Sequence, residues 1–229
     1  MVVVARSRSR RFLRNNGLGL VLFGLFAAII VGQAVAGFAA YKEELRTHGR
    51  APIALGEYLT RGHFTEAVFE NWESEFLQMG ALVVLTIFLR QRGSPESKPL
   101  KGKGPQDKDP REERRRPDAP WPVRRGGLAL AIYQHSLSIT LFGLFAVSFV
   151  FHALGGTAEH NAEAREHGEP TVSVLEFVSG PEFWYQSFQN WQSEFLAAGS
   201  LVVLAVFLRQ RGSPESKAVD EPHRETGTH

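Results

Sequence analysis

The stretch GALVVLTIFLRQRGSPESK at residues 80–98 recurs almost unchanged as GSLVVLAVFLRQRGSPESK at residues 199–217. The similarity extends upstream, because residues 18–98 align with residues 137–217 without a gap, and roughly half of the positions are identical. LFGLFA recurs at residues 22–27 and 141–146, and NWESEFL at residues 71–77 recurs as NWQSEFL at residues 190–196. The repeat predicts two tandem copies of one module. The shared residues have two interpretations, a shared function or a recent duplication.

Each copy contains two apolar segments. The first segments, at about residues 17–40 and 136–156, are long enough for a helix to cross a hydrocarbon core of about 30 Å. The second segments, at residues 76–89 and 195–208, are shorter, so these helices must begin earlier, near Trp72 and Trp191. The sequence therefore predicts an all-α integral membrane protein with four transmembrane helices, arranged as two tandem two-helix repeats. A signal peptide is the alternative interpretation of the first apolar segment. However, the corresponding segment of the second copy lies in mid-chain, where a signal peptide cannot be.

The distribution of Lys and Arg predicts the orientation. Basic residues precede the first span, fill the connection between the second and third spans, and follow the fourth span. In contrast, Arg165 is the only Lys or Arg of the loop between the third and fourth spans. By the positive-inside rule both termini are cytoplasmic. Each copy then has an even number of spans, so the two copies are parallel and related by a pseudo-two-fold axis along the membrane normal.

These boundaries divide the chain into five parts. We expect a basic cytoplasmic N-terminus at residues 1–16, a two-span module at 17–93, a flexible charged cytoplasmic linker at 94–128, a second module at 129–212 and a cytoplasmic tail at 213–229. The linker is rich in Pro, Gly and charge, which disfavours an independent core. Binding of anionic lipid through Arg114, Arg115 and Arg116 is the alternative to a solvated tether.

Composition and motifs exclude several classes of function. The chain has 229 residues, a net charge of +2 and no Cys. Its basic residues flank apolar segments, which indicates membrane orientation and no nucleic-acid partner. No motif for a metal, a nucleotide or a nucleophile is present, so we predict no cofactor and no enzyme. His152 has Gln33 as its counterpart in the first copy, and Glu73 has Gln192 in the second, so neither is predicted to be a shared functional group.

The repeated NWxSEF element supplies the candidate polar site. Helical spacing places its Asn, Ser and Glu on neighbouring turns of one face, and carboxylates at the edge of an apolar span face protein or water. One hypothesis is a paired proton or cation site near the outer surface; the preferred interpretation is an interfacial helix start, with the Trp residues as membrane anchors. The residues of the site are Asn71, Ser74, Glu75, Asn190, Ser193 and Glu194, and the anchors are Trp72 and Trp191.

The repeated RQRGSPESK element is typical of a helix end. Basic residues favour the last turn of a helix, and glycine favours the left-handed C′ position that follows it. A docking site for a cytoplasmic partner is the alternative. The predicted caps are Arg90, Arg92, Gly93, Arg209, Arg211 and Gly212.

Small residues recur at every fourth position of the first span, which allows close helix packing. We expect this face to form either a homodimer contact or a contact within the chain. Its residues are Gly24, Ala28, Gly32 and Ala36.

The order of LFGLF, HG, EYL, NWxSEF and FLRQRGSPESK, followed by a second copy, resembles a family of small bacterial membrane proteins of unknown function, over about residues 16–217. The resemblance implies a bacterial plasma-membrane protein and brings no activity. Two functions remain: a non-enzymatic scaffold or accessory protein, which the absence of chemical motifs favours, and a small ion or proton channel or transporter that uses Glu75 and Glu194.

Overall fold

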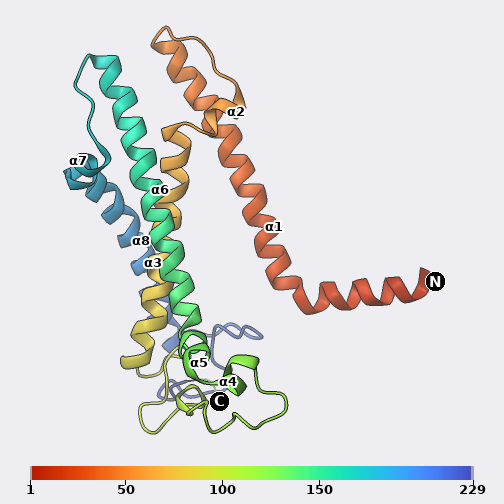
Figure 1. Cartoon of the computed structure of the whole chain (residues 1–229). Helices are drawn as coiled ribbons and strands as arrows, with labels where there is room; N and C mark the ends of the chain where they lie inside the picture. The colour runs from red at the N-terminus through yellow and green to blue at the C-terminus, as the bar shows by residue number, and fades with distance from the viewer. Residues whose placement is uncertain (1, 228–229) are drawn as a thin grey trace. The chain divides into compact units, whose positions relative to one another are not determined.

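The computed structural model describes residues 2–227, and the side chains of residues 10–227 (Figure 1). The described part of the chain is helical and contains no strand, which confirms the all-α class. Its elements are α1 (Val2–Thr47), α2 (Leu55–Tyr58), α3 (Gly62–Phe88), the 3-10 helix η1 (Pro105–Asp107), α4 (Trp121–Arg125), α5 (Gly127–Tyr133), α6 (Ser136–His167), α7 (Val174–Ser179) and α8 (Pro181–Phe207).

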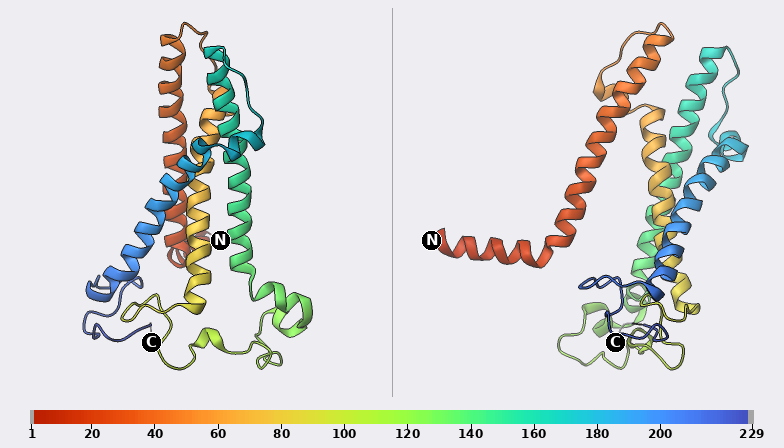
Figure 2. Two further views of the ribbon diagram at one scale, coloured as in Figure 1. Left: turned by 90° about the vertical axis from the view of Figure 1, so that its left-hand side faces the viewer. Right: turned by 180° about the vertical axis from the view of Figure 1, so that it is seen from behind.

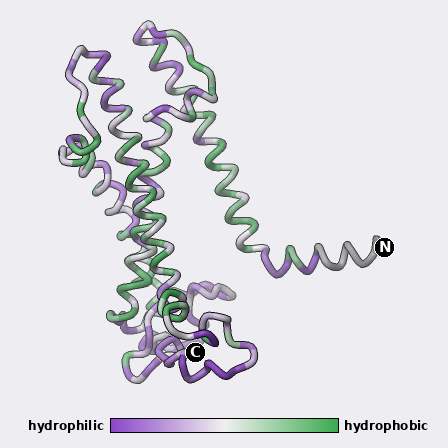
Figure 3. The backbone as a smooth tube through the Cα atoms, viewed as in Figure 1, coloured by the Kyte–Doolittle hydropathy of each residue, from purple (hydrophilic) through white to green (hydrophobic). Residues whose placement is uncertain are grey.

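Among the residues that the structure describes, three helices are long and apolar enough to cross a membrane: the Arg10–Thr47 part of α1, α6 and α8. Figure 3 shows the hydrophobic residues concentrated along them. The helix α3 corresponds to the second predicted span but is not among the three. Four glutamates in its first half lower its mean hydropathy, namely Glu66, Glu70, Glu73 and Glu75.

The chain forms two compact units, Met1–Thr65 and Glu66–His229. In the first unit, α2 and the adjoining loop fold onto the end of α1, where Tyr41, Leu45 and Tyr58 form a buried cluster. The Tyr58 hydroxyl lies 3.1 Å from His63 Nδ1 and so close to Gly37 that a Cβ there would be 2.3 Å away. The segment between α1 and α3 is therefore a loop with one helical turn, α2.

The second unit contains most of α3 together with α6 and α8, which lie alongside one another in the views of Figures 1 and 2. Its core is aromatic: Phe177 of α7 and Phe183 of α8 pack with Ala153 of α6. A Cβ at Gly156 would lie 2.6 Å from the Phe177 ring, so α6 needs a glycine where α7 covers it. The helix α7 begins with a capping box between Ser173 and Glu176, which fixes this cover.

The ends of α3 and α8 differ from the prediction. We expected the arginines in the last helical turn and the glycines directly after it, but the helices end at Phe88 and Phe207, so all six predicted cap residues follow the helix. Arg90 Nη1 donates to the carbonyls of Ile87 and Leu89, and Arg209 Nη1 donates to those of Ala205, Val206 and Leu208. The guanidinium groups therefore satisfy terminal carbonyls from outside the helix.

The glycines of the motif serve a turn beyond the helix. Gly93 and Gly212 have φ values of 84° and 85°, a left-handed conformation that favours glycine. The same hydrogen bond to a serine forms at both sites: the backbone N–H of Gln91 donates to Ser97 Oγ, and the backbone N–H of Gln210 donates to Ser216 Oγ. Arg92 and Arg211 are exposed. The RQRGSPESK element thus folds into the same compact turn twice.

The C-terminal tail is folded, although its composition predicts a solvated segment. The Gly93 amide donates to Thr226 Oγ1 over 2.8 Å, and the Gly227 amide donates to the Ser94 carbonyl over 3.0 Å. Lys217 is buried and its Nζ donates to the carbonyls of Pro222, His223 and Glu225, at 3.0, 3.1 and 3.0 Å. The tail therefore wraps around one lysine and reaches the first copy of the motif.

Replacing Lys217 with methionine is expected to release the tail, because three carbonyls lose their charged donor and each such hydrogen bond stabilises by about 1.5–3 kcal/mol. Limited trypsin digestion at Arg224 measures the release, and we expect cleavage to become at least tenfold faster. The exposed Arg211→Met is the matched control and should leave the rate unchanged. An unchanged rate for Lys217→Met would contradict the observed fold of the tail.

Candidate functional site

The second unit buries an ionisable pair between two long helices. Glu73 of α3 and His152 of α6 are both completely inaccessible to solvent, and His152 Nδ1 lies 2.7 Å from Glu73 Oε2. Phe183 of α8 stacks on the imidazole with ring centroids 4.6 Å apart. We call Glu73 and His152 the buried pair. Titratable groups without access to water are costly to bury and are characteristic of functional sites.

Three further side chains complete the surroundings of the buried pair. Trp191 Nε1 of α8 donates to Glu73 Oε1 over 3.0 Å, which occupies the second carboxylate oxygen. Gln186 of α8 lies 3.3 Å from His152 Nε2 through its Oε1, and its Nε2 donates to Glu66 Oε1 over 2.8 Å. We call these five residues the polar cluster. Helices α3, α6 and α8 all contribute to it.

Helical geometry explains how these residues meet. Glu66, Glu70 and Glu73 follow the spacing that places side chains on one face of a helix, and this face of α3 points at α6 and α8. The stacked rings of Phe69 and Phe151, with centroids 4.7 Å apart, hold α3 against α6 beside the pair. Glu70 lies within electrostatic reach of both His152 and Glu73. Glu66, Glu70 and Glu73 thus face protein, which reduces their exposure to lipid, whereas Glu75 is exposed.

The hydrogen bonds determine where one proton can move. Because Gln186 uses its amide nitrogen for Glu66, its oxygen faces His152 Nε2, so this ring nitrogen carries a hydrogen. Only one proton then lies between His152 Nδ1 and Glu73. If this proton is on Glu73, the pair is a neutral acid beside a neutral imidazole. If it is on His152, the pair is a carboxylate beside an imidazolium. Removing it would leave two lone pairs facing each other across 2.7 Å.

The polar cluster continues toward the end of the bundle that carries α7 and is closed on the other side. Beyond it, His160 Nδ1 of α6 lies 2.9 Å from Glu182 Oε2 of α8. In the opposite direction Ser148 and Ser187 are buried, and Ser187 Oγ finds no hydrogen-bond partner within residues 2–227. Farther along, the Phe142 ring packs on Gly80 so tightly that a Cβ at Gly80 would be 3.2 Å from it. An apolar contact therefore closes this end.

Comparison of the chain with models of known protein families identifies its family. Residues 9–228 match the model of DUF6766, a domain of unknown function. The chain belongs to the DUF6766 family. No curated protein and no solved structure matches it. The match is consistent with the resemblance to an uncharacterised family, and the function of this DUF6766 protein has to be argued from its own residues.

The predicted NWxSEF residues lie around the polar cluster without forming a paired site. The Asn71 and Asn190 amides donate to the carbonyls of Ala67 and Gln186, four residues earlier in their own helices. Ser74 and Ser193 donate to the carbonyls of Asn71 and Asn190. Asn71, Ser74 and Ser193 therefore form hydrogen bonds within their own helices, whereas Asn190 also forms a hydrogen bond with the Glu70 carboxylate of α3.

The two predicted carboxylates and the two anchors lie in different surroundings. Glu75 is exposed and Glu194 is partly buried, and they are close enough to repel each other. Neither carboxylate has a hydrogen bond or ion pair among the side chains that the structure describes. Trp191 has a polar partner in Glu73, whereas Trp72 packs on the Phe69 ring with centroids 5.2 Å apart.

The sequence comparison overlooked Glu73 and His152 because it favoured residues present in both copies. Each residue of the buried pair occurs once, opposite a glutamine of the other copy, Gln192 and Gln33. One signal could have identified them: an acid and a histidine, each unique to one copy, both lie in or beside apolar spans. The described residues contain no group of three or more His, Asp or Glu placed to hold a metal ion.

Proposed function

We propose that this DUF6766 protein is an integral protein of the bacterial plasma membrane that binds a proton at the buried pair and acts as a small proton-coupled channel or transporter. One observation supports this proposal above all others: Glu73 and His152 are fully buried, 2.7 Å apart, and lie on different long helices. Ionisable residues inside membrane helices are expensive and typically mark proton relays and ion pathways.

The proposed topology has four spans, with α3 as the fourth membrane helix, two parallel two-helix modules and both termini in the cytoplasm. Burial of Glu73 and the inward direction of Glu66 and Glu70 support a membrane position for α3, because its acids contact protein. The Arg-rich segments that follow α3 and α8 support the cytoplasmic position of these helix ends.

The proposed depth of the buried pair follows from helix geometry. The rise from Glu73 to Phe88 in α3 is about 22 Å, and the rise from Ser136 to His152 in α6 is about 24 Å. A hydrocarbon core of about 30 Å would therefore enclose the pair in its outer third. At this depth water is scarce, so a proton held by the pair is exchanged through neighbouring polar groups.

We propose that proton exchange is coupled to helix packing. With its proton, the pair ties α3 to α6; without it, the facing lone pairs repel and favour separation of the two helices. Gln186 and Glu66 provide the outer route for the proton, and the Phe142–Gly80 contact closes the inner side in this conformation. The pair would release its proton along the outer route, and the separated state, with the Phe142–Gly80 contact open, would take up the next proton from the inner side.

Proton flux into liposomes that contain the purified protein tests this function. Glu73→Gln keeps the shape and the acceptor for Trp191 but cannot ionise, so we expect flux to fall at least tenfold. Glu75→Gln is the matched control, two residues away on the exposed side of the same helix, and should retain wild-type flux. Absence of flux in the wild-type protein, or an equal loss in both variants, would reject the proposal.

A scaffold or accessory role is the second candidate, and the surface of α1 favours it. Within the unit Met1–Thr65, none of the apolar window of α1 is buried, and a Cβ at Gly24 or Gly32 would have no neighbour of that unit within 4 Å. We propose that the small residues Gly24, Ala28, Gly32 and Ala36 form a homodimer contact or receive a partner helix. A folded wild-type protein without proton flux would favour this function over transport.

A further inference from the structure

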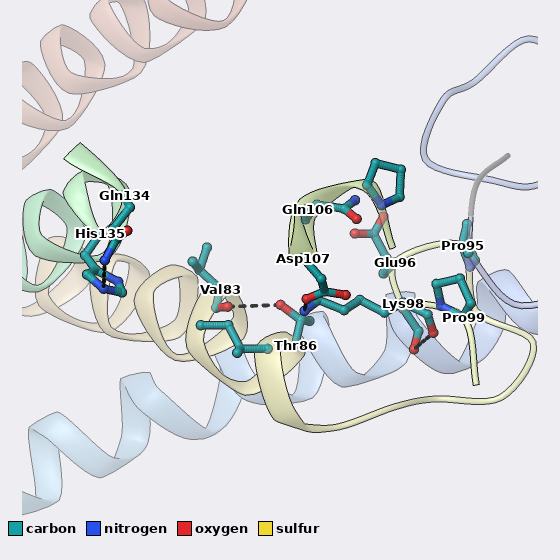
Figure 4. A pocket seen from close by; sticks show the side chains of 14 residues that line it. Val83, Thr86, Pro95, Glu96, Lys98, Pro99, Gln106, Asp107, Gln134 and His135 are labelled. Carbon is teal, nitrogen blue, oxygen red and sulfur yellow. Dashed lines mark hydrogen bonds and ion pairs between the residues drawn. The ribbon is translucent and has the colours of Figure 1, made fainter. Parts of the chain in front are cut away.

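A cavity of about 630 Å³ lies where α3 ends and α6 begins, within the second unit. Its volume is in the range of small-molecule sites. Val83 and Ile87 of α3 form an apolar wall, while Glu96, Lys98, Asp107 and His135 supply polar groups. Figure 4 shows Lys98 directed toward Asp107 with Glu96 nearby, and His135 on another side of the cavity.

The polar groups of the cavity carry both signs of charge. Lys98 Nζ forms an ion pair with Asp107, whose second carboxylate oxygen accepts the Gly104 amide at 2.9 Å. Glu96 has no ion-pair partner in the part of the chain that the structure describes. Burial raises the pKa of Glu96, and the nearby charge of Glu215 and a hydrogen bond between the two carboxyl groups raise it further. A cationic group in the cavity would offset both costs.

The apolar wall indicates how a ligand would enter. Ile87 and Phe88 are exposed large hydrophobic residues at the end of α3, and they lie at the level of the polar groups that follow the helix. In the proposed topology, on which this inference rests, this level is the cytoplasmic headgroup region. A ligand with an acyl chain could place the chain along Val83 and Ile87 and its polar part in the cavity.

We infer that this cavity binds the headgroup of a phosphoethanolamine lipid, with its ammonium at Glu96 and Asp107 and its phosphate at Lys98. An ammonium with three N–H donors fits two carboxylates, whereas the trimethylammonium of phosphocholine has no such donor. Phosphatidylglycerol brings no cation to Glu96. The site is separate from the buried pair, so its failure and the failure of proton transport are distinguishable.

Native mass spectrometry of the purified full chain in mild detergent tests the inference. Phosphatidylethanolamine, phosphatidylcholine and phosphatidylglycerol are added singly, and we expect one phosphatidylethanolamine to be retained with about tenfold preference, the size of one charge-assisted hydrogen bond. Glu96→Gln should remove most of this preference. The exposed Glu112→Gln, an acid of the same segment outside the cavity, should keep it.

Two further measurements make the result decisive. Val83→Phe places a larger ring on the apolar wall, where the acyl chain would lie, without changing an ion pair. It should abolish retention of the lipid, so loss does not depend on a variant that disturbs the loop. Free phosphoethanolamine should displace the lipid at concentrations at which inorganic phosphate does not. Equal retention of the three lipids, retention by Val83→Phe, or displacement by phosphate alone would overturn the inference.

Discussion

Replacing His152 with leucine is expected to destabilise the unit formed by residues 66–229 by about 3 kcal/mol. The substitution leaves Glu73 buried with only Trp191 as a partner, and an unpaired buried carboxylate is costly. It also leaves the Gln186 oxygen without its imidazole. Unfolding by SDS in mixed micelles, followed by tryptophan fluorescence, measures the free-energy change.

A double substitution separates the lost pair from the lost packing. Leucine at both Glu73 and His152 removes the two polar groups together, so we expect it to be less destabilised than His152→Leu alone, because replacing a buried pair by apolar residues is often neutral. Glu75→Leu is the control and should change stability by less than about 0.5 kcal/mol. Destabilisation of the double variant equal to the sum for Glu73→Leu and His152→Leu would show that the pair has no energetic coupling.

The sequence predicted the features that depend on local pattern. Apolar length identified α1 and α6, shorter apolar segments identified the second halves of α3 and α8, and the repeat predicted that Gly93 and Gly212 would share one backbone role. The precise helix ends were wrong, because Arg90 and Arg209 reach back to the terminal carbonyls from beyond the helix, which residue type alone does not distinguish from a position in the last turn.

The candidate site depended on contacts between distant residues, and the pattern within one helix could not predict them. Helical spacing grouped Glu75 with Asn71 and Ser74, but only tertiary packing decides that Glu73 is the acid that points at α6. The comparison of copies even argued against Glu73, because its counterpart is Gln192. In a duplicated protein, a function that joins the two copies can require residues that differ between them, as Glu73 from the first copy and His152 from the second do.

The folded tail was missed for a similar reason. Charged, Pro-rich segments do not form an independent core, but the tail needs none. Lys217 donates to three backbone carbonyls of the tail, and the Gly93 amide donates to Thr226 Oγ1. Such hydrogen bonds to the backbone depend on where the chain runs, and side-chain composition carries little information about them.

Replacing Phe183 with alanine is expected to destabilise the same unit by about 3 kcal/mol, the usual cost of removing a buried aromatic side chain. Phe183 is completely buried and contacts the rings of Phe149, Phe177 and Trp184. It also covers the His152 imidazole, so its removal should admit water to the buried pair. We therefore expect a second effect: proton uptake by the pair becomes faster, although the ionisable groups are unchanged.

Two comparisons distinguish packing from access to the buried pair. Phe188→Ala removes a ring of the same helix that is 58 % exposed, and should cost less than about 1 kcal/mol with no change in proton exchange. Phe183→Leu should recover most of the stability while still exposing one face of His152. Hydrogen exchange at the His152 ring, followed by NMR, reports this access. If Phe183→Ala lowers stability but leaves exchange at His152 unchanged, water reaches the pair by another route, and the stacked ring has only a packing role.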